Sequence, residues 1–256
     1  MIFDVLPALS IVIAGALYLR GCLRVRGGVY PGRVAAFYGG LVAAALALYG
    51  RVGDLSQVTF SGHMIQHVIL MSASAPLVIA GDAGRVIRFG SPRSMVRLVA
   101  RIPVGVRTAA RAAAACVLAY IVILWSWHLP TLYEAAIRND ALHALEHLTF
   151  FGVSLILWAL AFGRRRASEP VALAAVFLTS LAGAALGAVI TFAGTVLYPV
   201  HAVRATSIGL DALVDQQLAG AIMWVPPGVV SLTVMVLLVA RMLSRASSPA
   251  PVGSDR

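Results

Sequence analysis

Seven apolar runs divide this chain, and they restrict its fold more than any other feature. They lie at about 5–22, 33–50, 61–80, 108–127, 142–162, 171–194 and 216–240. A helix needs about 20 apolar residues to cross the hydrocarbon core of a bilayer, so each run is long enough, or nearly so, to span a membrane. Hydrophobic residues make up 60% of the sequence and charged residues only 12%, which excludes an ordinary soluble domain. We therefore predict an all-α polytopic membrane protein with seven transmembrane helices.

The runs leave no room for a separate soluble domain. We predict one seven-helix transmembrane domain over 1–245 and a disordered cytoplasmic tail over 246–256, because the last residues are rich in proline and serine. The first run has Asp4 before it and arginines after it, the reverse of a signal peptide. We therefore expect it to stay in the protein as the first transmembrane helix.

The basic residues are all arginine and are unevenly distributed. Seventeen of the 20 follow the first, third, fifth and seventh runs, whereas Arg51, Arg138 and Arg204 lie in the alternate loops. The positive-inside rule then predicts an N-terminus outside and a C-terminus inside. The net charge is +10, but the arginines are dispersed over the inner loops without interleaved aromatic residues. We therefore expect anionic lipids at the inner loops as partners and exclude nucleic acid.

All six histidines fall at the outer end of this predicted bundle. His63 and His67 begin the third run, and His143 and His147 begin the fifth. Each pair is spaced i,i+4, which places both imidazoles on one face of a helix. Ionisable groups at membrane depth are costly and usually functional. We expect the two pairs to bind a metal ion, in preference to packing or interhelical hydrogen bonding.

Other donors accompany the two histidine pairs. The third, fifth and seventh runs cross in the same direction, so we expect their polar first turns to converge. Met71 lies four residues after His67, and Met223 lies eight residues after Asp215 in the seventh run. Thioethers favour copper, particularly Cu(I), although each methionine alone is more typical of a core residue than of a ligand. Glu146 and Asp215 are candidates for oxygen ligands or for partners that orient a histidine N–H.

The remaining two histidines have different surroundings. His128 follows Trp125 and Trp127, so it fits either a metal ligand or an aromatic belt at the membrane surface. His201 lies in the loop after the sixth run, and we expect it to be an amphipathic residue at the headgroup level.

Three stretches of the chain resemble the CtaG family of cytochrome c oxidase assembly factors, of the caa-type oxidase kind. They are His63-Met64-Ile65-Gln66-His67-Val68-Ile69-Leu70-Met71, the segment from Trp127-His128-Leu129-Pro130 to His143-Ala144-Leu145-Glu146-His147, and Asp215-Gln216-Gln217-Leu218-Ala219-Gly220-Ala221-Ile222-Met223-Trp224-Val225-Pro226. Their order and spacing resemble the family pattern from the third run to the seventh.

The resemblance implies a bacterial plasma-membrane protein needed to mature a haem-copper oxidase. Copper is the implied metal, and subunits of the oxidase, above all its catalytic subunit, are the implied partners. The residues on the family's motif positions are His63, His67, His128, His143, Glu146, His147, Asp215 and Met223. His201 matches no motif position.

Two other classes of protein stay open on the sequence. His143, Glu146 and His147 fit the H-x-x-E-H pattern of zinc hydrolases, in which two histidines hold zinc and the glutamate activates water. A bis-histidine haem protein would instead use opposed histidines from two helices as axial ligands. The positions of all histidines on one side of the membrane argue against two haems at different depths.

Overall fold

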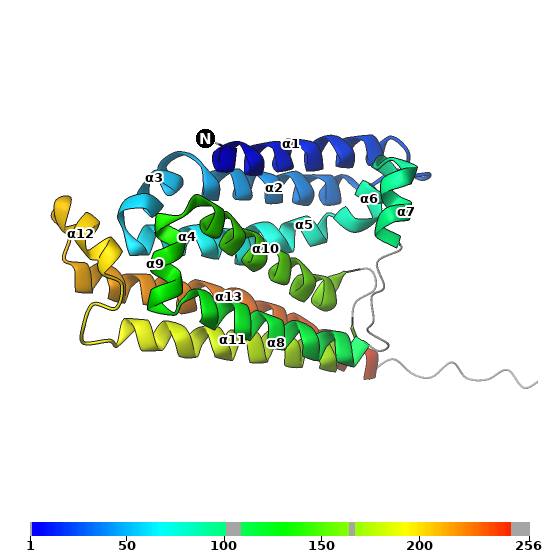
Figure 1. Cartoon of the computed structure of the whole chain (residues 1–256). Coiled ribbons are helices and arrows are strands. Elements are labelled where there is room, and N and C mark those ends of the chain that lie inside the picture. Colours follow the sequence, from blue (N-terminus) through cyan, green and yellow to red (C-terminus); the bar gives the residue numbers. More distant parts are fainter. Residues whose placement is uncertain (1, 101–108, 164–166, 247–256) are drawn as a thin grey trace, which may run out of the picture.

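Every regular element of the described residues is helical (Figure 1). The structure is a computed structural model, and it describes residues 2–100, 109–163 and 167–246. Seven helical segments there are long and apolar enough to cross a membrane, which confirms the predicted all-α class and the number of spans. They are α1 (Ile2–Cys22), α2 (Pro31–Leu48) with α3 (Gly50–Val58), α4 (Phe60–Val68) with η1 (Ile69–Ser74) and α5 (Ala75–Ala80), α8 (Ala109–Trp127), α10 (Asp140–Phe162), α11 (Glu169–Thr191) and α13 (Ala212–Ala246). The predicted tail from 247 onward and the arginines at 101, 107 and 164–166 lie outside the described residues.

Short helices cross the two ends of the bundle. They are α6 (Ala83–Gly90), α7 (Arg93–Ala100), α9 (Pro130–Arg138) and α12 (Pro199–Ser207). Helices α9 and α12 each begin with a proline, which favours the first helical position because its missing N–H would have no partner there. Figure 1 shows α3, α9 and α12 at one end of the bundle and α6 and α7 at the other.

Several predicted span boundaries were wrong. The second span ends at Leu48 instead of residue 50, and Gly50, with a φ of 64°, turns the chain into α3. The sixth ends at Thr191, and the seventh runs from Ala212 to Ala246 instead of 216–240. Hydropathy underestimated the seventh helix, whose last turns contain Arg241 and Arg245, and it overestimated the C-terminal ends of the second and sixth.

Helices α11 and α13 pack backbone to backbone beside α4. Gly220 makes this possible, because a Cβ at that position would lie 2.6 Å from the backbone nitrogen of Thr191. Ala219 is fully buried next to it. Helix α13 also contacts α4, and α10 contacts both α5 and α8. This packing brings the first turns of α4, α10 and α13 to the same end of the bundle (Figure 1).

The third span contains a π-helical turn, η1, where α4 joins α5. The amide of Ala75 donates to the carbonyl of Leu70, five residues back, and Pro76 has no N–H to donate. The carbonyl of Met71 therefore lacks its usual helical donor, because the amide of Ala75 donates to Leu70 instead. The indole nitrogen of Trp158 on α10 donates to this carbonyl at 2.8 Å. Such π turns mark functional regions of helices.

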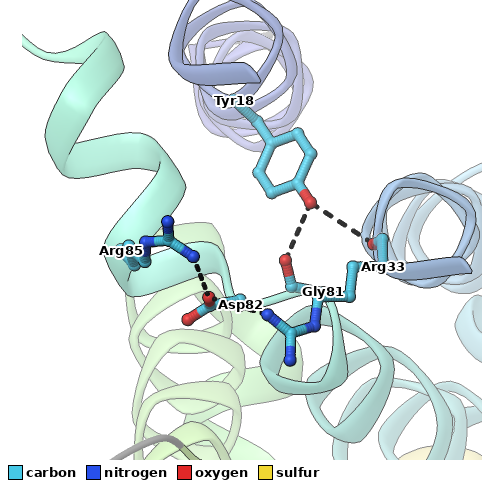
Figure 2. Close-up of polar contacts among 5 residues, drawn as sticks. All are labelled: Tyr18, Arg33, Gly81, Asp82 and Arg85. Carbon is cyan, nitrogen blue, oxygen red and sulfur yellow. Dashed lines mark hydrogen bonds and ion pairs between the residues drawn. The ribbon is translucent and has the colours of Figure 1, made fainter. Parts of the chain in front are cut away.

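The opposite end of the bundle is closed by polar contacts around Asp82 (Figure 2). Asp82 has a left-handed backbone, with φ 58°, and joins α5 to α6. Its carboxylate pairs with Arg33 at 3.3 Å and Arg85 at 3.5 Å. The hydroxyl of Tyr18 on α1 donates to the carbonyl of Gly81 at 2.7 Å. These contacts tie α1 and α2 to the end of the third span.

Candidate metal centre

Helix α4 carries His63 and His67 on the side that faces the bundle. Both imidazoles are buried, with exposed side-chain fractions of 0% and 5%. The helix begins directly after Thr59, whose side-chain oxygen accepts a hydrogen bond of 3.0 Å from the amide of Gly62. This N-cap satisfies one of the free amides of the first turn. It therefore fixes where α4 begins and on which face of the helix His63 and His67 lie.

Asp215 also fixes the first turn of α4. Its carboxylate accepts hydrogen bonds from the amides of Phe60 at 2.7 Å and Ser61 at 3.2 Å, and a further one from the hydroxyl of Ser61. The positive end of a helix dipole favours a negative charge at this position. Asp215 therefore anchors α4 to α13, which differs from the predicted role of a metal ligand or of a partner to a histidine ring.

Helix α10 supplies the second histidine pair and a carboxylate. It begins after Asn139, whose side chain accepts from the amides two and three residues later at 3.0 and 3.1 Å. His143, Glu146 and His147 follow within its first two turns. Glu146 is completely buried, whereas the two histidines are half-buried with their Nε2 atoms inside.

The carboxylate of Glu146 lies between the two imidazoles of α4. Its Oε2 atom is 3.7 Å from Nε2 of His63, and its Oε1 atom is 3.8 Å from Nε2 of His67. One donor atom from each of the three residues can be chosen so that all lie within 4.8 Å of one another. These distances are too long for hydrogen bonds, which end near 3.2 Å.

The rings of the two histidine pairs pack against each other across α4 and α10. The ring centroids of His63 and His143 are 5.2 Å apart, and those of His67 and His147 are also 5.2 Å apart. The predicted convergence of the two pairs is confirmed. We call His63, His67, His143, Glu146 and His147 the histidine–glutamate centre.

The polar atoms of this centre have no hydrogen-bond partners among the described residues. This holds for both ring nitrogens of His63 and His67, both oxygens of Glu146, and Nε2 of His143 and His147. Buried polar atoms without partners are rare in proteins, since each costs free energy unless something binds it. Two ligands bound at about 2.1 Å to one ion stand at most about 4.2 Å apart. The separations of 3.7 and 3.8 Å are therefore suited to a shared metal ion.

An aromatic layer separates the centre from the end of the bundle. It consists of Phe60, Tyr133 and Tyr198, with ring centroids 4.5 Å apart for Phe60 and Tyr198 and 4.7 Å apart for the two tyrosines. Burial raises the pKa of Tyr133 and of Tyr198, so both stay protonated. The hydroxyl of Tyr198 donates to the carbonyl of His128 at 2.8 Å, which fixes the layer to the end of α8.

His201 is buried beside the centre, so its predicted place at the headgroup level was wrong. Its exposed fraction is 2%, and its ring centroid lies 6.0 Å from that of His63. Helix α12 lies against α13 and α3, and Arg204 donates a 2.8 Å hydrogen bond to the carbonyl of Gln57 on α3. Burial, with a smaller contribution from Arg204, lowers the pKa of His201 to about 4. His201 is therefore a neutral imidazole at neutral pH.

His128 is buried and faces a cavity below the centre. Its Nδ1 atom lies 2.7 Å from the carbonyl of Leu124, so Nδ1 carries the proton and Nε2 keeps a lone pair. Burial lowers the pKa of His128, which favours this neutral form. The cavity has a volume of about 60 Å³, and His67, Met71 and Met223 also line it. Apart from Asp215, the structure thus divides the predicted residues between the centre and the cavity.

Tyr133, Tyr198 and His201 contact or cover the centre and were not predicted from the sequence. Tyr133 lies in the segment between His128 and His143 that resembles the CtaG family, which is a usable signal. Tyr198 and His201 carry no such signal, because their position depends on how α12 folds back onto α3.

The two alternative classes find less support in this geometry. Glu146 lies between two imidazoles of another helix, as a ligand does. A haem bound between opposed histidines needs a gap between the rings, whereas the rings of His63 and His143 on facing helices stack with their centroids 5.2 Å apart.

The fold and the centre define a seven-helix membrane protein with a buried cluster of imidazoles around one carboxylate. The chain belongs to the cytochrome c oxidase caa3 assembly factor family, CtaG, whose family model matches residues 16–245. This confirms the resemblance and extends it to α2 and the end of α1. The family description is that of an assembly factor, which suggests a role other than catalysis. Comparisons with curated proteins and with solved structures gave no match.

Proposed function

We propose that this protein binds copper at the histidine–glutamate centre and assists formation of the copper centre of a haem-copper oxidase. The observation that carries the proposal is the convergence of His63, His67 and Glu146, whose donor atoms lie within 4.8 Å of one another and are buried. The oxidase enters through the family, which is one of cytochrome c oxidase assembly factors.

The donor set favours copper or zinc over hard cations. Imidazole nitrogens bind both metals well, whereas calcium and magnesium prefer sites made of oxygen atoms. The thioethers of Met71 and Met223, which line the adjacent cavity, favour copper between these two. Zinc is the competitor that a binding experiment has to include.

The centre suits temporary binding of a metal ion. Glu146 supplies the negative charge that offsets part of the ion's charge in a buried place, and the imidazoles supply uncharged donors. The aromatic layer and α12 exclude water from the end of the bundle. An ion held in this way is protected from other ligands until a partner receives it.

The arginine distribution indicates which side of the membrane the centre faces. The positive-inside rule places the loops around Arg24 and Arg85 in the cytoplasm, where anionic lipids attract them, and the histidine end outside. We propose a bacterial plasma membrane as the location and the catalytic subunit of the oxidase as the receiving partner. Copper would then be taken up and delivered from the outer side.

Metal analysis of the purified protein tests the binding step. We expect the wild-type protein to retain copper after incubation with equal amounts of copper and zinc, and His63→Ala/His67→Ala to retain less of it. Asp54→Asn, an exposed acid on α3, is the matched control and should bind as the wild type does. Equal copper content in the wild type and the double variant would contradict the proposal.

Oxidase activity in cells tests the assembly step. Replacing His63 and His67 should lower haem-copper oxidase activity at normal protein level. Added copper should restore part of it, because mass action offsets a weakened binding site. Unchanged oxidase activity in the double variant would contradict the copper role even if the protein binds copper.

A further inference from the structure

The cavity below the histidine–glutamate centre has features that its packing does not explain. His67 and His128 line its upper part, and Ser154 lines it seven residues after His147, about 10 Å further along α10. A volume of about 60 Å³ is enough for about two water molecules or one metal ion with a ligand. The cavity therefore extends the polar interior from the centre towards the middle of the bundle.

Unpartnered polar atoms surround this cavity. Nε2 of His128, Oγ of Ser154 and Nε1 of Trp224 belong to lining residues, are buried and have no hydrogen-bond partner among the residues that the structure describes. Empty cavities in proteins are usually apolar, whereas polar ones hold water or an ion. His128 is 4% exposed, and the Leu124 carbonyl holds its ring so that the lone pair of Nε2 is free.

Two thioethers, one from each of two neighbouring spans, line the same cavity. Met71 and Met223 are each 8% exposed and lie in the third and seventh spans. The π-helical turn and the bond from Trp158 to the Met71 carbonyl fix the backbone on one side. On the other side, Pro227 cannot donate to the carbonyl of Met223, which leaves that oxygen without its usual helical partner.

We propose that this cavity is a second copper site, specific for Cu(I), with the thioethers of Met71 and Met223 and Nε2 of His128 as its ligands. Two sulfur donors and one imidazole select Cu(I) over zinc and over Cu(II). The centre above it offers nitrogen and oxygen donors only. The inference rests on the proposed copper role and divides it between two neighbouring sites of different ligand chemistry.

His67 connects the two sites. Its Nε2 atom lies 3.8 Å from Glu146 in the centre, and its side chain also lines the cavity. A Cu(I) ion can therefore exchange the carboxylate for a thioether while His67 stays bound. The ion moves deeper into the membrane by this exchange without a change of oxidation state.

Anaerobic titration with Cu(I) against a chromophoric competitor, followed by X-ray absorption at the copper edge, tests the second site. We expect the wild-type protein to bind two equivalents and to show a sulfur shell. Met71→Leu/Met223→Leu should lose one equivalent and the sulfur shell, while His63→Ala/Glu146→Gln should lose one equivalent and keep the sulfur shell. Met95→Leu, an exposed methionine of α7, is the matched control and should behave as the wild type.

The possible failures are distinguishable. One equivalent without a sulfur shell, lost in His63→Ala/Glu146→Gln, would overturn the second site and leave the proposed function intact. A sulfur shell that persists in Met71→Leu/Met223→Leu would overturn the assignment to these residues. If the wild-type protein binds no Cu(I), both proposals are overturned. If the double variant unfolds, the single variants Met71→Leu and Met223→Leu, which nearly conserve volume, take its place, and each should weaken the second equivalent.

Discussion

The carboxylate of Asp215 lies 2.7 Å from the backbone nitrogen of Phe60, and this hydrogen bond joins the first turn of α13 to the first turn of α4. Phe60 is three residues before His63, so it lies one helical turn above that imidazole. The contact spans 155 residues of sequence and is buried. The position of the α4 helix that carries His63 is therefore fixed relative to α13 by Asp215.

Replacing Asp215 should therefore weaken metal binding from a distance. In Asp215→Asn, one acceptor oxygen becomes an NH2 group facing backbone amides that also donate. Loss of a buried hydrogen bond to a charged group costs about 1.5–3 kcal/mol, so we expect lower thermal stability. We also expect copper affinity to fall by about 10–100-fold, as for other residues that position metal ligands. Competition titration and thermal unfolding measure both effects.

Asp211→Asn is the control for this variant. Asp211 is exposed and caps α13 by accepting from the amides of Leu213 and Val214, both at 2.9 Å. Asparagine is an equally good N-cap, so this variant should keep normal stability and affinity. Normal copper affinity in Asp215→Asn would show that the cap does not position His63.

The sequence was sufficient for the class of fold and the number of spans, because both follow from the free energy of placing apolar helices in lipid. It was insufficient for the short helices and for the helix ends. Helix α12 is an example: Pro199 is a local start signal, but no local pattern reveals the contact of Arg204 with α3. The π-helical turn at Met71 also depends on Trp158 from another helix.

The candidate centre was predictable where its chemistry repeats along one helix. The spacing of His63 with His67 and of His143 with His147 places each pair on one face, and the structure brings the pairs together. His201 has no such partner in sequence, so its burial near His63 could not be read from spacing. Asp215 was a polar residue in the right turn, but its neighbours are backbone amides instead of imidazoles.

Helix α12 should control how fast metal enters and leaves the centre. Arg204→Ala removes the 2.8 Å hydrogen bond to the carbonyl of Gln57, which connects α12 to α3. We expect faster release of bound copper to a chelator in stopped-flow measurements. Overall stability should change by only about 0.5 kcal/mol, because Arg204 is partly exposed and its partner is at the surface.

Arg51→Ala is the matched control, since Arg51 is an exposed arginine on α3 at the same end of the bundle. It should release copper at the wild-type rate. If Arg204→Ala and Arg51→Ala release copper equally fast, α12 does not limit exchange and the metal enters by another route.

The direction of the chain across the membrane can be measured by cysteine labelling. In a variant without Cys22 and Cys116, single cysteines at Asp54, Asp140 and Ser207 should react with an impermeant reagent added outside. A cysteine at Ser168 should react only after the membrane is opened. These expectations follow from the arginine distribution. The reverse pattern would move every histidine to the cytoplasmic side and remove the outer route for copper.

Glu146 distinguishes a metal-binding protein from a hydrolase. Its oxygens lie 3.7 and 3.8 Å from the imidazole nitrogens of His63 and His67, so we interpret it as a ligand. Glu146→Gln keeps the shape but removes the charge, and we expect a copper affinity at least about 10-fold lower. A hydrolase would behave differently, because a general base can be lost without losing the metal. Unchanged metal content in Glu146→Gln, together with loss of a peptidase activity present in the wild type, would establish the hydrolase in place of the copper role.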